Sequence, residues 1–401
     1  MTARQGTARD ALPLAAFAAL KALDRLKVGT LAISLPDGGT RRVVGAQPGP
    51  EAALEIRDWH VFSRVLSSGD MGFAEGYMAG EWDTPDLVRL LELMAANEAA
   101  LARVARASWW RRQLLRLAHL RHDNTRRGSR RNIHAHYDLG NAFYSLWLDP
   151  TMTYSSALYD GDGARSLDQA QRAKYERILD RLGARQGDTL LEIGCGWGGF
   201  AETAARRGVR VRAITISQEQ LAYARERLSR AGLAHIASVE FRDYRDVEGT
   251  YDHIVSIEMI EAVGERHWPS YFDALKRHLN PRGRAIVQAI TIADDCFERY
   301  RRGADFIQTY IFPGGMLPSA ETLRAQARRA GMALAGAHAF GRDYARTLEA
   351  WLGRFDGVVE RVRGLGFDDR FVRMWRYYLA YCAAGFSSGR TDVVQAEFTH
   401  S

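Results

Sequence analysis

The sequence predicts an α/β fold, in which a doubly wound, mainly parallel sheet is preceded by a smaller α+β domain. Two observations support this prediction. After Arg131, short apolar runs typical of strands alternate with amphipathic helical patterns, and this β-α-β-α order indicates a parallel sheet covered by helices. Before Arg131, a strand–turn–strand pattern is followed by helical patterns. With 401 residues, the chain is long enough for two or three domains.

The first apolar segment, Ala11–Leu20, follows Arg4 and Arg9 and so shares features with a secretory signal peptide. Two features favour an ordinary helix instead. Asp10 interrupts the entry to the apolar run, and an amphipathic helical pattern continues as far as Lys27. No apolar run in the sequence reaches the roughly 18 residues that a membrane-spanning helix requires.

A β-hairpin is predicted next, because Leu31–Leu35 and Arg42–Val44 flank a Pro-Asp-Gly-Gly turn. Thr84, with the proline that follows it, then provides a helix start, since an N-cap side chain precedes proline at the first helical position. From Asp86 a helical pattern continues towards Leu120.

The segment Trp109–Arg131 mixes two tryptophans and four leucines with eight arginines. It suits a helix in a membrane interface, a segment that follows nucleic-acid phosphates, or a solvated basic linker. Across the chain Lys and Arg (55) outnumber Asp and Glu (48), which favours an anionic partner. We therefore divide the chain into a first domain (1–107), a basic amphipathic linker (108–131) and a second domain (132–401).

The second domain contains predicted strands separated by helices. Its first long helix begins at Ser166, where Gln169 completes a capping box, and ends at Gly183. The strands that follow are Thr189–Ile193, Val209–Ile216, Val239–Arg242, His253–Ile257 and Ala285–Ile292, and the helices between them are Phe200–Arg207, Gln218–Ala231 and Trp268–Leu279.

Four glycines, Gly194, Gly196, Gly198 and Gly199, follow the first of these strands and open a helix, so that a ligand can approach the backbone closely. Their spacing also satisfies the dinucleotide fingerprint G-x-G-x-x-G, which alone is weak evidence. Two features favour S-adenosylmethionine over a nicotinamide dinucleotide. Glu192 precedes the first glycine, and its charge suits a cationic sulfonium better than a pyrophosphate. The second strand also ends without the acidic residue that a dehydrogenase uses at the ribose.

Six longer segments carry further motifs, among them HYDLGN and YIFPGG, which are highly specific in combination. In these segments the chain resembles the cyclopropane-fatty-acyl-phospholipid synthases and the related mycolic acid and fatty acid methyltransferases. The resemblance covers roughly residues 130 to 390 and also includes Gly72–Leu87. The six segments are Asn132–Tyr159, Leu190–Gln220, Phe241–Asp246, Ile254–Phe272, Tyr310–Ser319 and Asp343–Trp351.

The resemblance implies a Rossmann-like class I methyltransferase domain over residues 132–401 and a lipid-assisting domain over residues 1–107. It implies methyl transfer from S-adenosylmethionine to the cis double bond of acyl chains in membrane phospholipids, which gives cyclopropane chains. It also implies a cytoplasmic protein at the inner face of the membrane, and a homodimer. The resemblance also implies the residues that surround S-adenosylmethionine, which are Tyr154, Ser155, Gly194, Gly196, Thr215, Ile216, Gln220, Tyr244 and Ile257. To these we add their neighbours Glu192 and Asp243.

The reaction of this family leaves a carbocation in the acyl chain, and a bound bicarbonate ion is the usual base that removes a proton. The resemblance implies that Glu261, Tyr344 and the backbone of Ile290 hold this ion. The sequence departs from the family pattern at three positions, because Ser156 replaces a cysteine, Gln288 replaces a histidine, and Ala262 stands where a histidine often follows the glutamate. Ser156 and Gln288 can still donate hydrogen bonds to an anion, but the ability of the histidine to shuttle a proton is lost.

Two products follow from this chemistry. Loss of a proton from the new methyl group would close a cyclopropane ring. A hydride shift and the loss of a different proton would instead leave a methyl-branched or methylene chain. We expect Ser156 and Gln288 to favour this second outcome.

Two other functions remain open. The arginines of segment 108–131 would form the nucleic-acid surface of an RNA methyltransferase, or catalysis would have been lost in a lipid-binding protein, against which the intact glycine loop argues. We expect a phospholipid surface as partner rather than nucleic acid, and no metal, because His134 and His136 have no third ligand at helix spacing. The three cysteines are too far apart to suggest a disulfide framework, which favours the cytosol.

Overall fold

The computed structural model describes residues 13–105 and 139–401. The chain divides into two compact units, Met1–Arg112 and Gln113–Ser401. The whole of the predicted linker 108–131, and the two histidines considered as metal ligands, lie outside the described residues. Among the residues that are described, no helix is long and apolar enough to cross a membrane.

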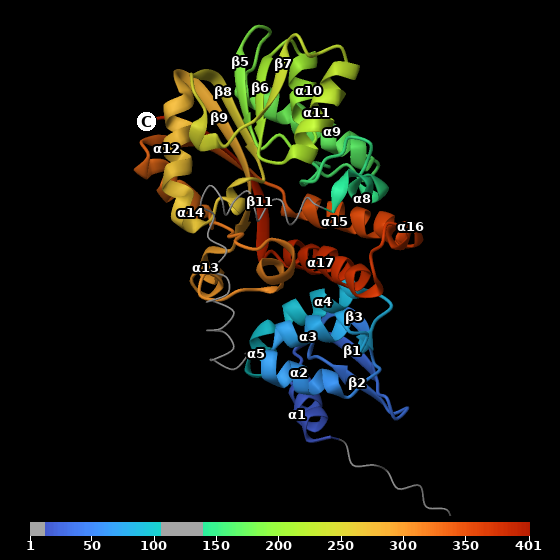
Figure 1. The fold of residues 1–401 in the computed structure, drawn as a ribbon. Helices are drawn as coiled ribbons and strands as arrows, with labels where there is room; N and C mark the ends of the chain where they lie inside the picture. The colour runs from blue at the N-terminus through green and yellow to red at the C-terminus, as the bar shows by residue number, and fades with distance from the viewer. Residues whose placement is uncertain (1–12, 106–138) are drawn as a thin grey trace, which may run out of the picture. The chain divides into compact units, whose positions relative to one another are not determined.

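The first unit combines a four-stranded sheet with helices, which confirms the predicted α+β character (Figure 1). The strand order is β2-β1-β3-β4, in which β1 is antiparallel to β2 and parallel to β3. The predicted hairpin is therefore confirmed as β1 and β2. The elements are α1 (Leu14–Leu23), β1 (Val28–Ser34), β2 (Thr40–Val44), β3 (Gln47–Ile56), α2 (His60–Ser68), α3 (Asp70–Met78), β4 (Trp82–Asp83), α4 (Leu87–Ala96) and α5 (Glu98–Ala105).

The predicted helix start at Thr84 is wrong by two residues. Asp86 is the N-cap of α4, because its carboxylate accepts the backbone N–H of Arg89 at 2.9 Å. The hydroxyl of Thr84 instead donates to the carbonyl of Ala53 at 2.7 Å and so ties the turn to β3. The helical pattern is also interrupted at Asn97, between α4 and α5.

The second unit contains a seven-stranded sheet in the order β10-β11-β9-β8-β5-β6-β7. Strands β7, β6, β5, β8 and β9 are parallel, and β11 is antiparallel to both of its neighbours. The strands are β5 (Thr189–Ile193), β6 (Arg210–Thr215), β7 (Ala237–Phe241), β8 (Tyr251–Ile257), β9 (Leu279–Ile292), β10 (Met332–Ala339) and β11 (Thr391–His400). The predicted doubly wound, mainly parallel sheet is confirmed.

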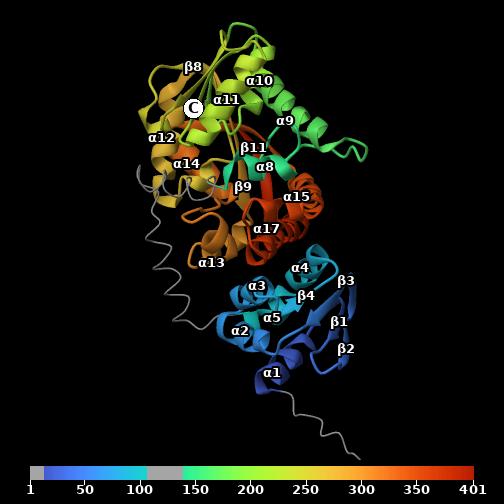
Figure 2. The same ribbon diagram turned by 45° about the vertical axis from the view of Figure 1, so that its right-hand side comes forward.

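Helices cover both faces of this sheet, as Figures 1 and 2 show. One apolar core joins residues of β5–β9 to the helices α9, α10 and α11, and the other joins residues of β5, β6 and β8–β11 to the helices α12 and α14. The α-helices of the unit are α8 (Gly140–Trp147), α9 (Leu167–Leu182), α10 (Gly199–Arg206), α11 (Gln218–Arg230), α12 (Trp268–His278), α13 (Asp294–Tyr300), α14 (Ala320–Arg329), α15 (Gly341–Asp356), α16 (Val359–Gly364) and α17 (Asp369–Ser387). Short 3-10 turns are η1 (Tyr244–Asp246), η2 (Ile260–Ala262) and η3 (Glu265–His267), and η4 (Ile307–Ile311) is a π-helix.

The order of the strands reverses at β5. From β5 the chain passes through α10 to β6 and through α11 to β7, and it then returns to β8 on the other side of β5. In doubly wound sheets, ligands bind outside the carboxyl ends of the strands at such a switch point. The topology therefore directs attention to the residues that follow β5, β6 and β8.

Candidate active site

The glycine loop directly follows β5 and has a backbone that favours glycine. Gly194, Gly196 and Gly198 have φ values of 83°, 51° and 82°, in the left-handed region. A Cβ atom at Gly196 would meet nothing within 4 Å, whereas one at Gly194 would lie 3.0 Å from Cγ of Met259. The loop is thus open at Gly196, where a ligand can approach it, and closely packed at Gly194 against the segment after β8.

Glu192 lies in β5 beneath this loop and is only 3% exposed. Its Oε2 atom has no hydrogen-bond partner within the described residues, and burial raises the pKa of its carboxyl group well above the usual range. A buried carboxyl oxygen without a hydrogen-bond partner beside an open glycine loop fits a cationic or hydrogen-bonding ligand. Glu192 and the glycine loop therefore fit S-adenosylmethionine, as the sequence predicted.

The predicted ribose partners meet at the end of β6. The Thr215 hydroxyl donates to Oε1 of Gln220 at 2.9 Å, and Ser217 between them caps α11 by accepting the N–H of Gln220. Ile216 follows Thr215 directly, and Ile257 ends β8 on the far side of β5. These side chains therefore lie at the carboxyl ends of strands on both sides of the switch point.

Asp243 and Tyr244 follow the end of β7, in and before η1. The Asp243 carboxylate caps η1 and also accepts two hydrogen bonds from the guanidinium of Arg245, at 2.8 and 2.7 Å. Tyr244 is buried, with only 8% of its surface exposed. In this structure the charge of Asp243 is thus balanced within the loop itself.

Tyr154 belongs to an aromatic cluster beside the carboxyl ends of the strands. Its ring lies 5.4 Å from the ring of Trp351, and its hydroxyl group is 2.7 Å from that of Tyr378. Trp351 in turn lies 6.1 Å from Tyr344. The rings come from the loop after α8 and from α15 and α17, which gather at this end of the sheet in Figures 1 and 2. We define the aromatic cluster as Tyr144, Trp147, Tyr154, Tyr344, Trp351 and Tyr378.

The structure adds a residue that the sequence analysis missed, Glu258, which directly follows β8. Its backbone has φ 51°, an unusual value for a residue with a side chain. Its Oε1 atom accepts hydrogen bonds from the backbone N–H of Ser156 and from the amide of Gln288, both at 2.8 Å. Its Oε2 atom accepts the hydroxyl of Tyr344 at 2.6 Å. Three predicted catalytic residues therefore converge on a carboxylate of the chain itself.

Glu261, in η2, provides a second carboxyl group next to this one. Its Oε1 atom accepts the backbone N–H of Ile290 at 2.5 Å, and its Oε2 atom has no partner in the described part of the chain. Burial, together with repulsion from Glu258, raises the pKa of Glu261 to about 8. At neutral pH we therefore expect Glu261 to hold a proton. On Glu258, the charge of Lys174 and the hydrogen bonds that its carboxylate accepts favour the ionised form against the effect of burial.

Lys174, in α9, is the second residue that the sequence analysis missed. It is fully buried, and its ammonium group donates to the Ser155 hydroxyl at 2.6 Å and to Oε1 of Gln171 at 2.7 Å. Burial lowers the pKa of Lys174 to about 7, although the nearby charge of Glu258 opposes this shift. Burial likewise raises the pKa of Glu258, and the charge of Lys174 is the main influence that opposes that rise. The two groups thus stabilise each other's charged forms.

Comparison with known proteins identifies the family to which this arrangement belongs. Residues 124–396 match the family model described as mycolic acid cyclopropane synthetase. The chain belongs to this family. It is 42% identical over 340 residues to the tuberculostearic acid methyltransferase UfaA1 of Mycobacterium tuberculosis, which covers 83% of this chain and 79% of the relative. It is 34% identical over 382 residues to the cyclopropane-fatty-acyl-phospholipid synthase of Escherichia coli, which covers 92% of this chain and 95% of the relative.

A solved structure of a family member agrees with these matches. The mycolic acid cyclopropane synthase CmaA1, in complex with SAH and CTAB, superposes with a TM-score of 0.63 at 30% identity. The superposition covers 67% of this chain and 97% of CmaA1. The protein is an S-adenosylmethionine-dependent methyltransferase of the class I fold, and its family modifies fatty acyl chains.

The position of Glu258 directly after a predicted strand was a signal in the sequence for a residue at the ligand-binding edge. Residues directly after parallel strands line the ligand-binding edge of such a sheet, and Glu258 holds this position after β8. Lys174 carried no comparable signal, because it lies in the polar sequence of α9 and its burial arises only from packing.

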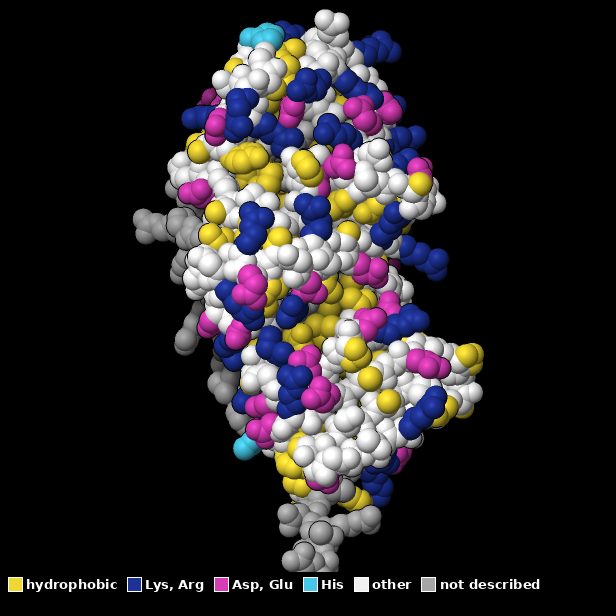
Figure 3. All heavy atoms as spheres, turned by 90° about the vertical axis from the view of Figure 1, so that its right-hand side faces the viewer, with side chains coloured by type: hydrophobic (Ala, Val, Ile, Leu, Met, Phe, Trp, Pro, Cys, Tyr) yellow, Lys and Arg dark blue, Asp and Glu magenta, His cyan; other side chains and the backbone are white. Residues whose placement is uncertain are grey.

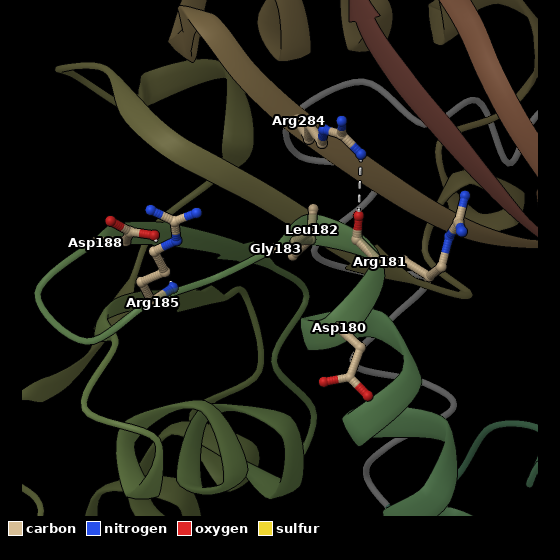
Figure 4. A pocket seen from close by; sticks show the side chains of 7 residues that line it. All are labelled: Asp180, Arg181, Leu182, Gly183, Arg185, Asp188 and Arg284. Atoms are coloured by element: carbon tan, nitrogen blue, oxygen red, sulfur yellow. Dashed lines mark hydrogen bonds between the residues drawn. The ribbon is translucent and has the colours of Figure 1, made fainter.

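A separate pocket lies at the opposite end of β5, before the strand begins (Figure 4). Charges of both signs line it, and one of its arginines, Arg181, is paired with Glu397 at 2.6 Å. None of the predicted site residues is among those that line it, which are Asp180, Arg181, Leu182, Gly183, Arg185, Asp188 and Arg284.

Proposed function

We propose that the protein transfers the methyl group of S-adenosylmethionine to the cis double bond of unsaturated acyl chains in membrane phospholipids. The observation that carries this proposal is the position of the carboxylate of Glu258. It follows β8 beside the glycine loop, and its partner Tyr344 belongs to the aromatic cluster. A methyl-transfer site with a base and aromatic faces suits a reaction that passes through a carbocation.

The residues of the chain would divide the work as follows. The loop at Gly194 and Gly196, Glu192 and the Thr215–Gln220 pair would hold S-adenosylmethionine, which supplies an electrophilic methyl group when bound. Because an alkene is a poor nucleophile, its alignment with that methyl group must supply much of the rate. The aromatic cluster would stabilise the cation by its ring faces and exclude water that would trap it.

For the product, we propose a methyl-branched or methylene chain. After a hydride shift the cation lies on the carbon that carries the new methyl group. Loss of a proton from that methyl group then gives a methylene chain, and loss from a neighbouring chain carbon gives a methyl-branched alkene. The higher identity to a fatty acid methyltransferase, 42% against 34%, and the presence of Ser156 and Gln288 support this choice.

Cyclopropane formation is the second candidate. The E. coli cyclopropane synthase matches nearly the whole of this chain, 92%, and 95% of its own length. In this reaction the proton leaves the new methyl group before any hydride shift, and the electron pair closes the ring. The same base and the same aromatic cluster serve both reactions.

We further propose that the protein acts at a phospholipid surface on the cytoplasmic side, as a homodimer. The excess of basic over acidic residues supports an anionic surface as partner. On the face in Figure 3, Lys and Arg side chains are interspersed with Asp and Glu. We therefore expect binding to anionic vesicles to be weak and salt-sensitive. Binding to RNA but not to vesicles would favour the RNA methyltransferase alternative.

The test uses purified protein, vesicles of dioleoyl phosphatidylglycerol and S-adenosylmethionine with a trideuterated methyl group. Mass spectrometry of the released acyl chains reports the deuterium content. A methylene or cyclopropane product retains two deuterons, and a methyl-branched alkene formed by loss of a chain proton retains three. Ozonolysis cleaves the alkenes and leaves the ring intact. A cyclopropane as the main product would refute the branched-chain proposal, and absence of label from every acyl chain would refute the substrate class.

A further inference from the structure

The hydrogen-bond donors that the sequence assigned to a bicarbonate ion are occupied by carboxylates of the chain. The backbone N–H of Ser156, the amide of Gln288 and the hydroxyl of Tyr344 all donate to Glu258. The remaining donor, the backbone N–H of Ile290, binds the carboxyl group of Glu261. A bicarbonate ion would have to displace these groups and sit beside negative charge, which costs energy at a buried position. The site does not fit that ion.

We propose that Glu258 is the catalytic base of this enzyme and takes the place of an external anion. This inference rests on the proposed methyl transfer to an acyl double bond. It assigns the removal of the proton to a side chain that is permanently attached to the active site. No bicarbonate is then required for turnover.

The hydrogen bonds of Glu258 hold its carboxylate and still leave it able to accept a proton. An ionised carboxylate has about four lone-pair sites. Oε1 accepts two hydrogen bonds and Oε2 accepts one, from Tyr344. One lone pair of Oε2 is therefore available for a proton from the substrate. Gln288 is itself held by Gln395, whose amide donates to it at 3.0 Å, so the base is supported from β9 and β11.

Glu258 also lies at the right place in the fold. It is flanked by Ile257, which ends β8, and by Met259, which a Cβ atom at Gly194 would touch at 3.0 Å. On its other side, Tyr344 leads into the aromatic cluster through Trp351. A carboxylate between the methyl donor and the cation-stabilising rings can reach the protons that the cation makes acidic.

The charges around Glu258 favour its ionised form. The positive charge of Lys174 is the strongest influence that opposes the rise in the pKa of Glu258 caused by burial. Glu261 has a pKa of about 8, so at neutral pH it is mostly protonated and adds little repulsion. A pair of carboxyl groups with different environments is a common way to obtain one base and one neutral partner.

The step balances as follows. The π electrons of the double bond form the new C–C bond, and the C–S bond of the sulfonium breaks with its electrons on sulfur. The positive charge is then on the acyl chain. For an alkene product, Oε2 of Glu258 takes a proton from a carbon next to the cationic carbon, and the electrons of that C–H bond form the double bond. For a ring product, it takes a proton from the new methyl group before any hydride shift, and the electrons of that C–H bond form the third side of the ring. The neutral Glu258 later returns its proton to solvent.

The test compares two variants at this position, E258Q and E258G, in the full-length protein. Gln keeps the shape of the side chain but cannot take a proton. Glycine suits the φ value of 51° at this position and leaves room, with three donors, for a small anion. We expect both variants to lose at least about 100-fold in kcat. We expect sodium bicarbonate or sodium formate to restore activity to E258G but not to E258Q.

The wild type is assayed in buffer freed of carbon dioxide, with and without added bicarbonate, and we expect equal rates. As a control for handling, E360Q alters a glutamate on α16 whose side chain is 84% exposed, and it should behave as wild type. Binding of S-adenosylhomocysteine by calorimetry, within about threefold of wild type, shows that each variant is folded.

Three results would overturn the proposal. The first is that bicarbonate stimulates the wild type. The second is that E258Q retains more than about a tenth of the wild-type activity. The third is that neither bicarbonate nor formate restores activity to E258G, although this variant still binds S-adenosylhomocysteine. The last result would make Glu258 a positioning residue. If the wild type itself labels no acyl chain, the proposed function fails before this comparison begins, so the two failures are distinct.

Discussion

Replacing Glu261 by glutamine would test the electrostatics of the carboxyl pair directly. Burial and repulsion from Glu258 raise the pKa of Glu261 to about 8. Glutamine preserves the shape of the side chain, and its carbonyl oxygen can still accept the N–H of Ile290. The other oxygen of Glu261 has no partner to lose among the described residues. The variant E261Q therefore isolates the cost of a negative charge at this position.

The size of the effect follows from linkage. An unperturbed glutamate titrates near pH 4.5, so between pH 4.5 and about 8 the folded wild type binds a proton that the unfolded chain has released. Its free energy of unfolding therefore falls as pH rises, by about 1.4 kcal/mol per pH unit, and it levels off above pH 8. The whole interval corresponds to at most about 5 kcal/mol. Because Glu261 is not wholly buried, we expect E261Q to gain about 2 to 4 kcal/mol over wild type between pH 5 and pH 8.5.

Urea unfolding of the full-length proteins, followed by tryptophan fluorescence at pH 5.5, 7.0 and 8.5, would measure this difference. The exposed-site variant E360Q serves as the control at each pH. A stability difference between E261Q and wild type that does not change with pH would refute the assignment of the raised pKa to Glu261. The tryptophans that report on the second unit are Trp147, Trp197, Trp268, Trp351 and Trp375.

Three further predictions concern the loop, the buried lysine and the first unit. In G194A, the left-handed φ of 83° and the contact with Met259 should weaken binding of S-adenosylhomocysteine at least tenfold, and an unchanged Kd in calorimetry would contradict this. In K174M, the loss of a positive charge should raise the pKa of Glu258 and move the acidic limb of the pH–rate profile to higher pH, whereas an unshifted limb would count against the coupling. In N97A, three hydrogen bonds to Lys27 and Val28 at the start of β1 and one to the Leu93 carbonyl in α4 are lost, which should cost about 2 to 4 kcal/mol in chemical unfolding, and a loss below about 1 kcal/mol would contradict the reasoning.

Much of the fold of the second unit could be predicted from local pattern. Strand β5 was predicted with its observed ends, because its apolar run lies at the centre of the sheet and is bounded by turn residues. Strand β10 was not predicted, since its sequence, MALAGAHA, consists largely of alanine and glycine, which are depleted in strands. It becomes a strand by pairing with β11, which is distant in sequence.

The shift of the α4 N-cap from the predicted Thr84 to the observed Asp86 also results from a tertiary contact. Both residues can cap a helix, and the residue types alone favour the one before proline. The choice is made by β3, because the Ala53 carbonyl accepts the hydroxyl of Thr84 and leaves Asp86 to cap α4. A tertiary contact therefore moves the start of a helix by two residues.

The sequence by itself determined the glycine loop and the doubly wound sheet, and its resemblance to the family indicated Ser156, Gln288, Glu261 and Tyr344 as candidate catalytic residues. These features depend on local backbone preference, on apolar periodicity and on motifs that are continuous along the chain. Only the tertiary structure decided what those residues contact. Glu258 is separated from Ser156 by 102 positions in the sequence, from Gln288 by 30 and from Tyr344 by 86, and a hydrogen bond between such residues exists only when the strands and helices have packed. Burial then sets the charge of each carboxyl group, because the cost of ionisation depends on the surroundings that folding creates.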